Sequence, residues 1–144
     1  MGGSYTLSGR ADIEWLAALH RLVERVGHDH PELRPSDLAK METAIIEVIG
    51  NVVEHGTPPG AIGYEFSLEV ADDRLQALLL ETGDPVPLRA MDQDQDHELA
   101  ESGRGLGIAR AVLSELRYER RGDLNAWTLT RSLTPRDHDS PQVS

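Results

Sequence analysis

The chain of 144 residues contains no cysteine, which excludes disulfide bonds and cysteine-ligated zinc sites. Aromatic residues are few, and no apolar run approaches the roughly 20 residues that a membrane-spanning helix needs. The first ten residues, MGGSYTLSGR, lack the basic and then apolar layout of a secretory signal. We therefore expect a cytoplasmic protein that does not enter a membrane.

Positive charge is also scarce. The chain has 14 Lys and Arg residues and 25 Asp and Glu residues, which give a net charge of −11. An acidic surface repels phosphates, which argues against direct binding to nucleic acid. Lys40 is the only lysine, and the phosphate-binding motif G-x-x-x-x-G-K-[ST] is absent. A nucleotide phosphate would therefore be bound without a lysine-centred loop.

Hydrophobic periodicity predicts a single domain over residues 1–134 and a disordered tail over residues 135–144. The expected helices cover residues 12–26, 36–55 and 107–117, with Asp12 and Ser36 as N-caps and Gly27 as the end of the first helix. The expected strands cover residues 5–7, 61–70, 74–80 and both arms of a closing hairpin with its turn at residues 122–125. Hairpins with helices on one face indicate an α+β fold, a two-layer sandwich with a mixed, mainly antiparallel sheet.

The stretch ESGRGLGIAR places Gly103, Gly105 and Gly107 at every second position before an apolar-periodic run. Glycine costs conformational entropy, whereas the free N–H groups at a helix N-terminus bind anions. The stretch is therefore either a flexible hinge or a phosphate-binding junction. Residues 90–103 contain five acidic side chains and no Lys or Arg, which is typical of a solvated loop or of a lid over a site.

Two further groups of polar residues border apolar segments. Glu47 and Asn51 are one turn apart in the predicted helix 36–55, so they project from one side of it. The neutral amide oxygen of Asn51 suits a hard cation such as Mg²⁺, and Glu47 can act as a base toward a hydroxyl group. Glu81 ends an apolar strand, where its carboxylate can accept a hydrogen bond from an exocyclic amine such as that of adenine. The alternatives are a solvated helix face and an ordinary strand exit.

Together, the segments EVIGNVVEHG, ETGDPVP and ESGRGLGIAR resemble the GHKL (Bergerat-fold) ATP-binding domain. Within that superfamily the chain most resembles the bacterial anti-sigma-factor serine/threonine kinases. The resemblance implies that Asn51 ligates the Mg²⁺ of bound ATP and that Glu47 is the general base toward a substrate serine. It also implies nucleotide contacts from Glu81, Gly83, Gly103, Arg104, Gly105, Leu106, Gly107 and Thr128, with Thr128 near the adenine.

The resemblance implies partners as well. Such a kinase binds a sigma factor or another regulated target and phosphorylates a serine of a STAS-domain anti-anti-sigma factor, and related kinases are often homodimers. The family usually carries Asp where this chain has Glu81. Because glutamate is one methylene longer, the alternative is a nucleotide-weak binding module that sequesters its partner. A third reading is the catalytic half of a histidine kinase, although 144 residues leave no room for an added dimerising helical hairpin.

Overall fold

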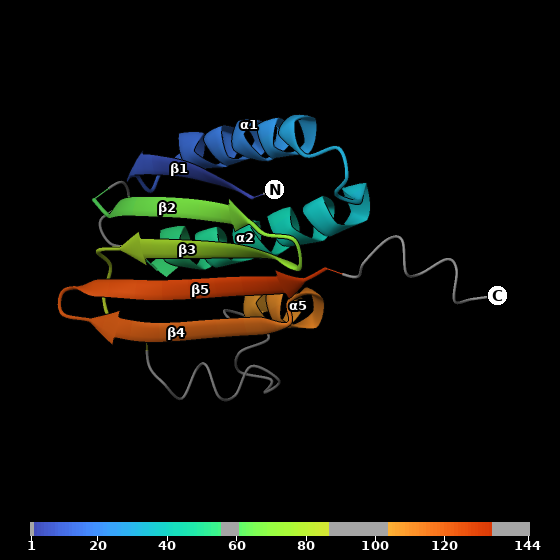
Figure 1. Ribbon diagram of the computed structural model, residues 1–144. Helices are drawn as coiled ribbons and strands as arrows, with labels where there is room; N and C mark the ends of the chain where they lie inside the picture. Colours follow the sequence, from blue (N-terminus) through green and yellow to red (C-terminus); the bar gives the residue numbers. More distant parts are fainter. Residues whose placement is uncertain (1, 56–60, 87–103, 134–144) are drawn as a thin grey trace.

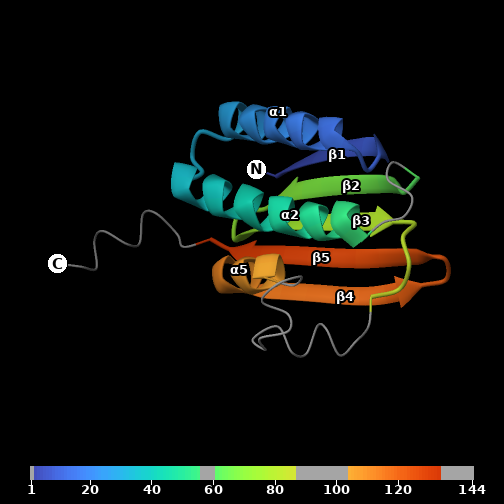
Figure 2. The same cartoon turned by 180° about the vertical axis from the view of Figure 1, so that it is seen from behind.

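The computed structural model describes residues 2–55, 61–86 and 104–133, which form two layers (Figure 1). One layer is a five-stranded sheet in the order β1-β2-β3-β5-β4, and three described helices cover one of its faces (Figure 2). The elements are β1 (Gly3–Arg10), α1 (Ile13–Asp29), α2 (Pro35–His55), β2 (Gly63–Val70), β3 (Arg74–Glu81), α5 (Arg104–Val112), β4 (Glu115–Arg121) and β5 (Leu124–Ser132). The predicted α+β two-layer sandwich is thus confirmed.

Every described strand pairs with its neighbours in antiparallel fashion, so the sheet contains no parallel pair among the described residues, where a mixed sheet was expected. β3 lies in the middle, and its last residue, Glu81, is opposite Tyr64 of β2 and Asn125 of β5. A two-residue turn joins β4 to β5, and its first residue, Gly122, has a φ of 61°. Glycine adopts that left-handed conformation without steric cost, which suits a tight hairpin.

The first two helices differ from the prediction at their ends. The N-cap at Asp12 is confirmed, because its Oδ1 accepts a hydrogen bond from the Glu14 N–H at 3.0 Å. Gly27 does not end α1 but lies inside it, where an added Cβ would lie 3.2 Å from Leu38 Cδ1. The glycine therefore serves close packing between two helices. α2 begins at Pro35 and not after a cap at Ser36, consistent with the preference for proline in a first helical turn.

The largest correction concerns residues 107–117, which were predicted to form one helix. The structure has α5 end at Val112, and Leu116 lies in β4, opposite Leu129 of β5. The spacing of Ile108, Val112 and Leu116 fits a helix. Pairing with β5 overrides it, because a strand edge supplies backbone hydrogen bonds that a short isolated helix end cannot match.

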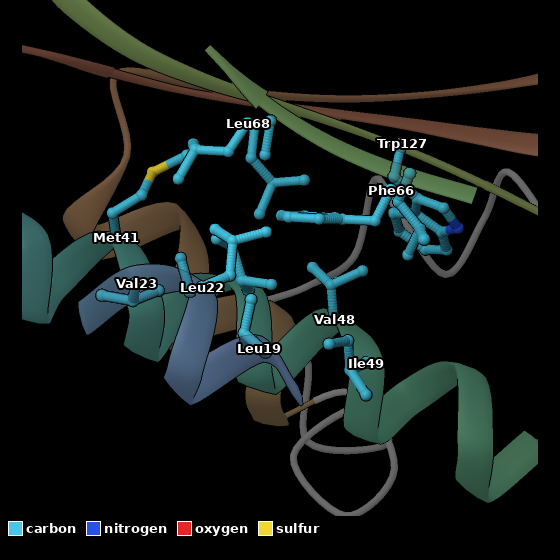
Figure 3. Close-up of a cluster of buried hydrophobic side chains, with 14 of the residues drawn as sticks. Leu19, Leu22, Val23, Met41, Val48, Ile49, Phe66, Leu68 and Trp127 are labelled. Carbon is cyan, nitrogen blue, oxygen red and sulfur yellow. The ribbon is translucent and has the colours of Figure 1, made fainter. Parts of the chain in front are cut away.

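The core fills the space between the sheet and the helices. Figure 3 shows Phe66, Leu68 and Trp127 of the sheet facing Leu19, Leu22, Val23, Met41, Val48 and Ile49 of the helices. At one end of this layer the Trp15 ring stacks on the Tyr64 ring, with 3.8 Å between centroids and 14° between planes. None of the helices in the described ranges carries an apolar stretch long enough to span a bilayer.

A single arginine ties the sheet to two helices. Arg131 of β5 donates from Nε and Nη2 to Asp37 Oδ1 in the first turn of α2, at 2.9 and 2.8 Å. Its Nη1 donates to the Val112 carbonyl at the end of α5, at 2.5 Å. Both side chains are mostly buried, so each charge depends on the other for compensation.

We expect Asp37→Ala to lower the free energy of unfolding by about 3 kcal/mol, because it leaves the Arg131 guanidinium buried without its counter-charge. Urea denaturation followed by circular dichroism measures this change. Asp73→Ala is the matched control, since Asp73 pairs with Arg74 at 3.5 Å on the exposed surface and such pairs contribute roughly 0–1 kcal/mol. Equal effects of the two substitutions would show that the buried pair has no special role.

Candidate nucleotide site

The α2 part of the site is the pair predicted from the sequence. Asn51 is half-buried, and its Nδ2 donates to the Glu47 carbonyl oxygen at 2.9 Å. This bond fixes the amide plane, and in the described part of the chain no hydrogen bond occupies Asn51 Oδ1. The Glu47 side chain is also half-buried, one turn earlier on the same side of the helix. The pair therefore presents an oriented neutral oxygen beside a carboxylate.

The described part of the glycine-rich segment is the start of α5. α5 begins at Arg104, so Gly105, Leu106 and Gly107 lie in its first turn, while Gly103 lies outside the described residues, as does the acidic stretch before it. Leu106 is buried in the core, and an added Cβ at Gly107 would have no described atom within 4 Å apart from its chain neighbours and the backbone of α5 itself. α5 packs alongside α2 (Figure 2), and its first N–H groups have no partner within the helix.

Glu81 is buried at the end of β3, with 2% of its surface exposed. Its Oε2 accepts hydrogen bonds from Trp127 Nε1 at 2.9 Å and from Asn125 Nδ2 at 3.0 Å. Its Oε1 accepts one from the backbone N–H of Gly83 at 2.7 Å. A carboxylate oxygen has two acceptor positions. Oε2 is therefore saturated by the protein, and Oε1 retains one position for a further donor.

Asn125 is a buried polar residue of this network that was not predicted from the sequence. Its Nδ2 donates to Glu81 Oε2 and to the Asp84 carbonyl at 2.8 Å, and its Oδ1 accepts from Tyr118 Oη at 2.5 Å and Arg120 Nη1 at 3.1 Å. The sequence did contain a signal. Asn125 lies two residues before the buried Trp127, so both side chains lie on the same face of the strand. A polar side chain on the buried face of a strand usually has a specific hydrogen-bond partner.

The same side chains hold the segment that leaves β3. Arg120 Nη1 donates to the Gly83 carbonyl at 2.8 Å, and the Val86 N–H donates to Tyr118 Oη at 2.8 Å. The backbone at Gly83 lies so close to the carboxylate that an added Cβ would be 2.7 Å from Glu81 Oε1. A side chain at this position would therefore clash with the carboxylate, and the predicted contact of Gly83 with a nucleotide stays a prediction.

The structure does not bring Thr128 to Glu81. Trp127 and Leu129 are buried on the helix-covered face, so Thr128 between them projects to the opposite, open face, where it is paired with Leu78. The residue of β5 beside the carboxylate is Asn125, and the predicted place of Thr128 near the adenine stays a prediction.

These groups gather at one end of the molecule, because α2 and β3 both end there (Figures 1 and 2). Burial, followed by the charge of Asp12, raises the pKa of the Tyr64 hydroxyl opposite Glu81, so the phenol stays neutral at physiological pH. The described residues contain no group of three His, Asp or Glu side chains that could enclose a metal ion. A magnesium ion bound through Asn51 would share its remaining positions with water and phosphate oxygens, as Mg²⁺ commonly does.

We expect Asn125→Ala to lower the free energy of unfolding by about 2 kcal/mol, because it removes a donor from a buried carboxylate and releases the Asp84 carbonyl. Thermal or urea denaturation provides the measurement. Thr128→Ala removes a polar side chain from the same strand on its open face and should cost less than about 1 kcal/mol. A larger loss for Thr128→Ala than for Asn125→Ala would contradict the assigned network.

Comparison with known proteins shows the family of this chain. A family model described as the histidine kinase-like ATPase domain matches residues 9–131. Among solved structures the chain is similar to the histidine kinase domain of the blue-light activated histidine kinase EL346 from Erythrobacter litoralis, with a TM-score of 0.53 and 15% identity. The match covers 82% of this chain and 60% of that one. No curated protein matches the chain. From the extent of the family match, the chain belongs to the histidine kinase-like ATPase domain family.

Proposed function

We propose that the chain binds Mg-ATP and acts as a serine/threonine protein kinase of the anti-sigma-factor type. The observation that carries the proposal is the Glu47–Asn51 pair, in which the helix itself fixes the amide and leaves Oδ1 to a ligand. The open space at Gly107 and the first-turn N–H groups of α5, which packs along the same helix, suit the phosphates.

The residues present fit the proposed nucleotide. Asn51 Oδ1 would hold the magnesium ion, which neutralises phosphate charge when bound. The backbone of Gly105, Leu106 and Gly107 would contact phosphate oxygens, with Gly103 and Arg104 as expected contributors from the same segment. The remaining acceptor position on Glu81 Oε1 would take the exocyclic amine of adenine.

Glu47 would take the proton of the attacking serine hydroxyl. The side chain is half-buried beside Asn51, so a magnesium ion at Asn51 would bring the terminal phosphate close to it. Positioning and charge stabilisation supply most of the rate in phosphoryl transfer, and the base adds a smaller factor.

The proposed substrate is a serine of a STAS-domain anti-anti-sigma factor in the cytoplasm, and the proposed target is a sigma factor or another regulator. A kinase of this kind would release the target when its antagonist is unphosphorylated. The acidic chain, with a net charge of −11, suits protein partners with basic surfaces.

One observation favours a second candidate function, a nucleotide-weak module that sequesters its partner. Three of the four acceptor positions of the Glu81 carboxylate are already used by Trp127, Asn125 and Gly83. An adenine amine would therefore find a single free position on a side chain that the protein holds rigidly. Calorimetry with Mg-ATP separates the two candidates, and a dissociation constant in the micromolar range or tighter supports the kinase.

We expect Mg-ATP to raise the melting temperature of the wild-type chain, because a ligand that binds only the folded state stabilises it, by about 2.7 kcal/mol at a hundredfold excess over Kd. The variant Asn51→Ala should lose this shift. Glu54→Ala, an exposed position on the same helix, should keep it. A shift that survives in Asn51→Ala would remove Asn51 from the site.

We expect Glu47→Gln to keep the melting shift with Mg-ATP but to transfer phosphate to the STAS-domain protein of the same organism at least about a hundredfold more slowly, since the amide cannot accept the proton. Radiolabelled ATP and phosphoserine analysis measure the transfer. Label that is acid-labile and resides on histidine would instead support a histidine kinase. No transfer by the wild type, with both proteins folded, would refute the kinase.

A further inference from the structure

Strand β1 forms one edge of the sheet (Figure 1). It pairs with β2 on one side, and no other described strand pairs with it on its outer side. The two longest gaps between or after the described ranges begin at the opposite half of the sheet, since Val86 bonds to Tyr118 of β4 and Leu133 follows β5. The outer side of β1 is therefore a separate surface from the candidate nucleotide site.

Hydrogen bonds at both ends of β2 show which of its residues bond to β1. The Ala71 N–H, directly after β2, donates to the Arg74 carbonyl at 2.9 Å, so the odd-numbered residues of this strand bond to β3. The even-numbered residues bond to β1, in agreement with the Ala11 N–H, which donates to the Ile62 carbonyl at 2.8 Å. The partners of those even-numbered residues in β1 are odd-numbered.

Ser4, Thr6 and Ser8 of β1 consequently direct their backbone N–H and C=O groups outward, and all three residues are exposed. Edge strands are usually protected from pairing by charged side chains, by proline or by a bulge. From Gly3 to Gly9, β1 has no charged residue and no proline, and its register with β2 is uninterrupted. This edge can therefore accept another strand.

Two exposed carboxylates lie beside this edge, on the open face of the sheet. Glu65 of β2 is opposite Ser8 of β1, and Glu69 is opposite Ser4. Within the described ranges neither glutamate forms an ion pair or a side-chain hydrogen bond. Because serine is small, a long side chain can cross β1 at either position and reach the carboxylate behind it.

The open face is hollowed at the same place. A cavity of about 370 Å³ extends over β1, β2 and β3, and its lining includes Thr6, Ser8, Glu65, Leu78 and Leu80. The hydroxyl groups and the carboxylate are its polar part, and the two leucines are apolar. An arginine side chain suits such a lining, because its aliphatic stem covers apolar surface while its guanidinium binds a carboxylate.

We propose that the β1 edge binds an extended basic segment of another protein, which joins the sheet as a further antiparallel strand. Residues of this segment opposite Ser4, Thr6 and Ser8 exchange backbone hydrogen bonds with them. Arginines opposite Ser4 and Ser8 reach Glu69 and Glu65. The added strand lies two strand spacings, about 9.5 Å, from β2, so only a long side chain spans the distance.

The rest of the chain supports the choice of a basic occupant. A net charge of −11 attracts basic segments and repels acidic ones, including a second copy of this chain. On the helix-covered face, Leu7 of β1 is only half-buried, so the residue of the added strand beside it should be apolar. The site does not require nucleotide binding, and its test is independent of the proposed kinase activity.

A synthetic peptide, Ac-Thr-Arg-Val-Thr-Val-Arg-Thr-NH2, tests the site on the full chain. Its arginines are four residues apart, as are Ser4 and Ser8. With the peptide near saturation, NMR should show that amide hydrogen exchange at Ser4, Thr6 and Ser8 slows by roughly tenfold. The amides of Tyr5 and Leu7 already bond to β2 and should change little.

Charge reversal tests the arginine contacts. Glu65→Lys should weaken binding of the peptide by roughly tenfold, because it places like charges side by side, and Glu69→Lys serves where that variant does not fold. A peptide with both arginines replaced by glutamate should bind the double variant Glu65→Lys with Glu69→Lys and not the wild type. Glu115→Lys makes the same change at an exposed position of β4 on the same face and should leave binding unchanged.

Circular dichroism establishes that each variant is folded. A peptide with N-methyl groups on both arginines and the central threonine retains its charge but cannot donate to β1, and it should not bind. The proposal is overturned if the wild type does not bind the first peptide, if the methylated peptide binds equally well, or if Glu65→Lys behaves like Glu115→Lys. Protection of Ser4, Thr6 and Ser8 that grows with protein concentration without peptide would place a second copy on β1 and also overturn it.

Discussion

The buried carboxylate of Glu81 is the constraint on which this end of the molecule depends. A carboxylate taken out of water costs several kcal/mol unless hydrogen bonds replace the lost hydration. Here the replacements come from an indole, an amide and a backbone N–H, supplied by Trp127, Asn125 and Gly83. A shift of β5 by one residue would turn the first two donors to the other face of the sheet. The carboxylate therefore fixes the register between β3 and β5 as well as the path of the chain after β3.

The two sides of the candidate site are built by different means. Asn51 is oriented by its own helix, through a bond to the carbonyl one turn earlier. Glu81 is oriented by a network that spans two strands and the residues up to Val86. The helix side therefore depends on local geometry, whereas the sheet side depends on correct tertiary pairing. The longer side chain of Glu81 is accommodated by hydrogen-bond partners within the fold.

Much of this architecture follows from the sequence because the apolar phase of each long element is clear. The apolar stripe over residues 36–55 and the alternation over residues 61–70 predicted α2 and β2 and the two-layer packing. The prediction was wrong at Leu116, where the helical spacing continues by chance beyond the end of the helix. This residue belongs to β4 because it pairs with Leu129 of β5. The prediction was also wrong at Gly27, since nothing local reveals that Leu38 will pack against it.

The site followed the same division. The spacing of Glu47 and Asn51 predicted that they share one side of a helix, and the structure has them so, because one helix determines their relative position. Their roles toward a nucleotide stay predictions. The place of Asn125 could not be predicted, because its role exists only once β5 lies beside β3. Thr128 was predicted from the family resemblance, and strand alternation places it on the face opposite the one that holds Trp127. A linear pattern therefore predicts positions within one helix, and it does not contain the long-range strand pairing that places Asn125 beside Glu81.

The central place of β3 has a consequence during synthesis. Its neighbour on one side, β2, precedes it in the chain, but the neighbour on the other side, β5, is translated more than 40 residues later. Until β5 leaves the ribosome, the apolar segment LQALLL of β3 forms an open sheet edge, the kind of surface that recruits strands from other chains. The nascent protein is thus most prone to aggregate in the interval before its last hairpin inserts, when chaperone protection would matter most.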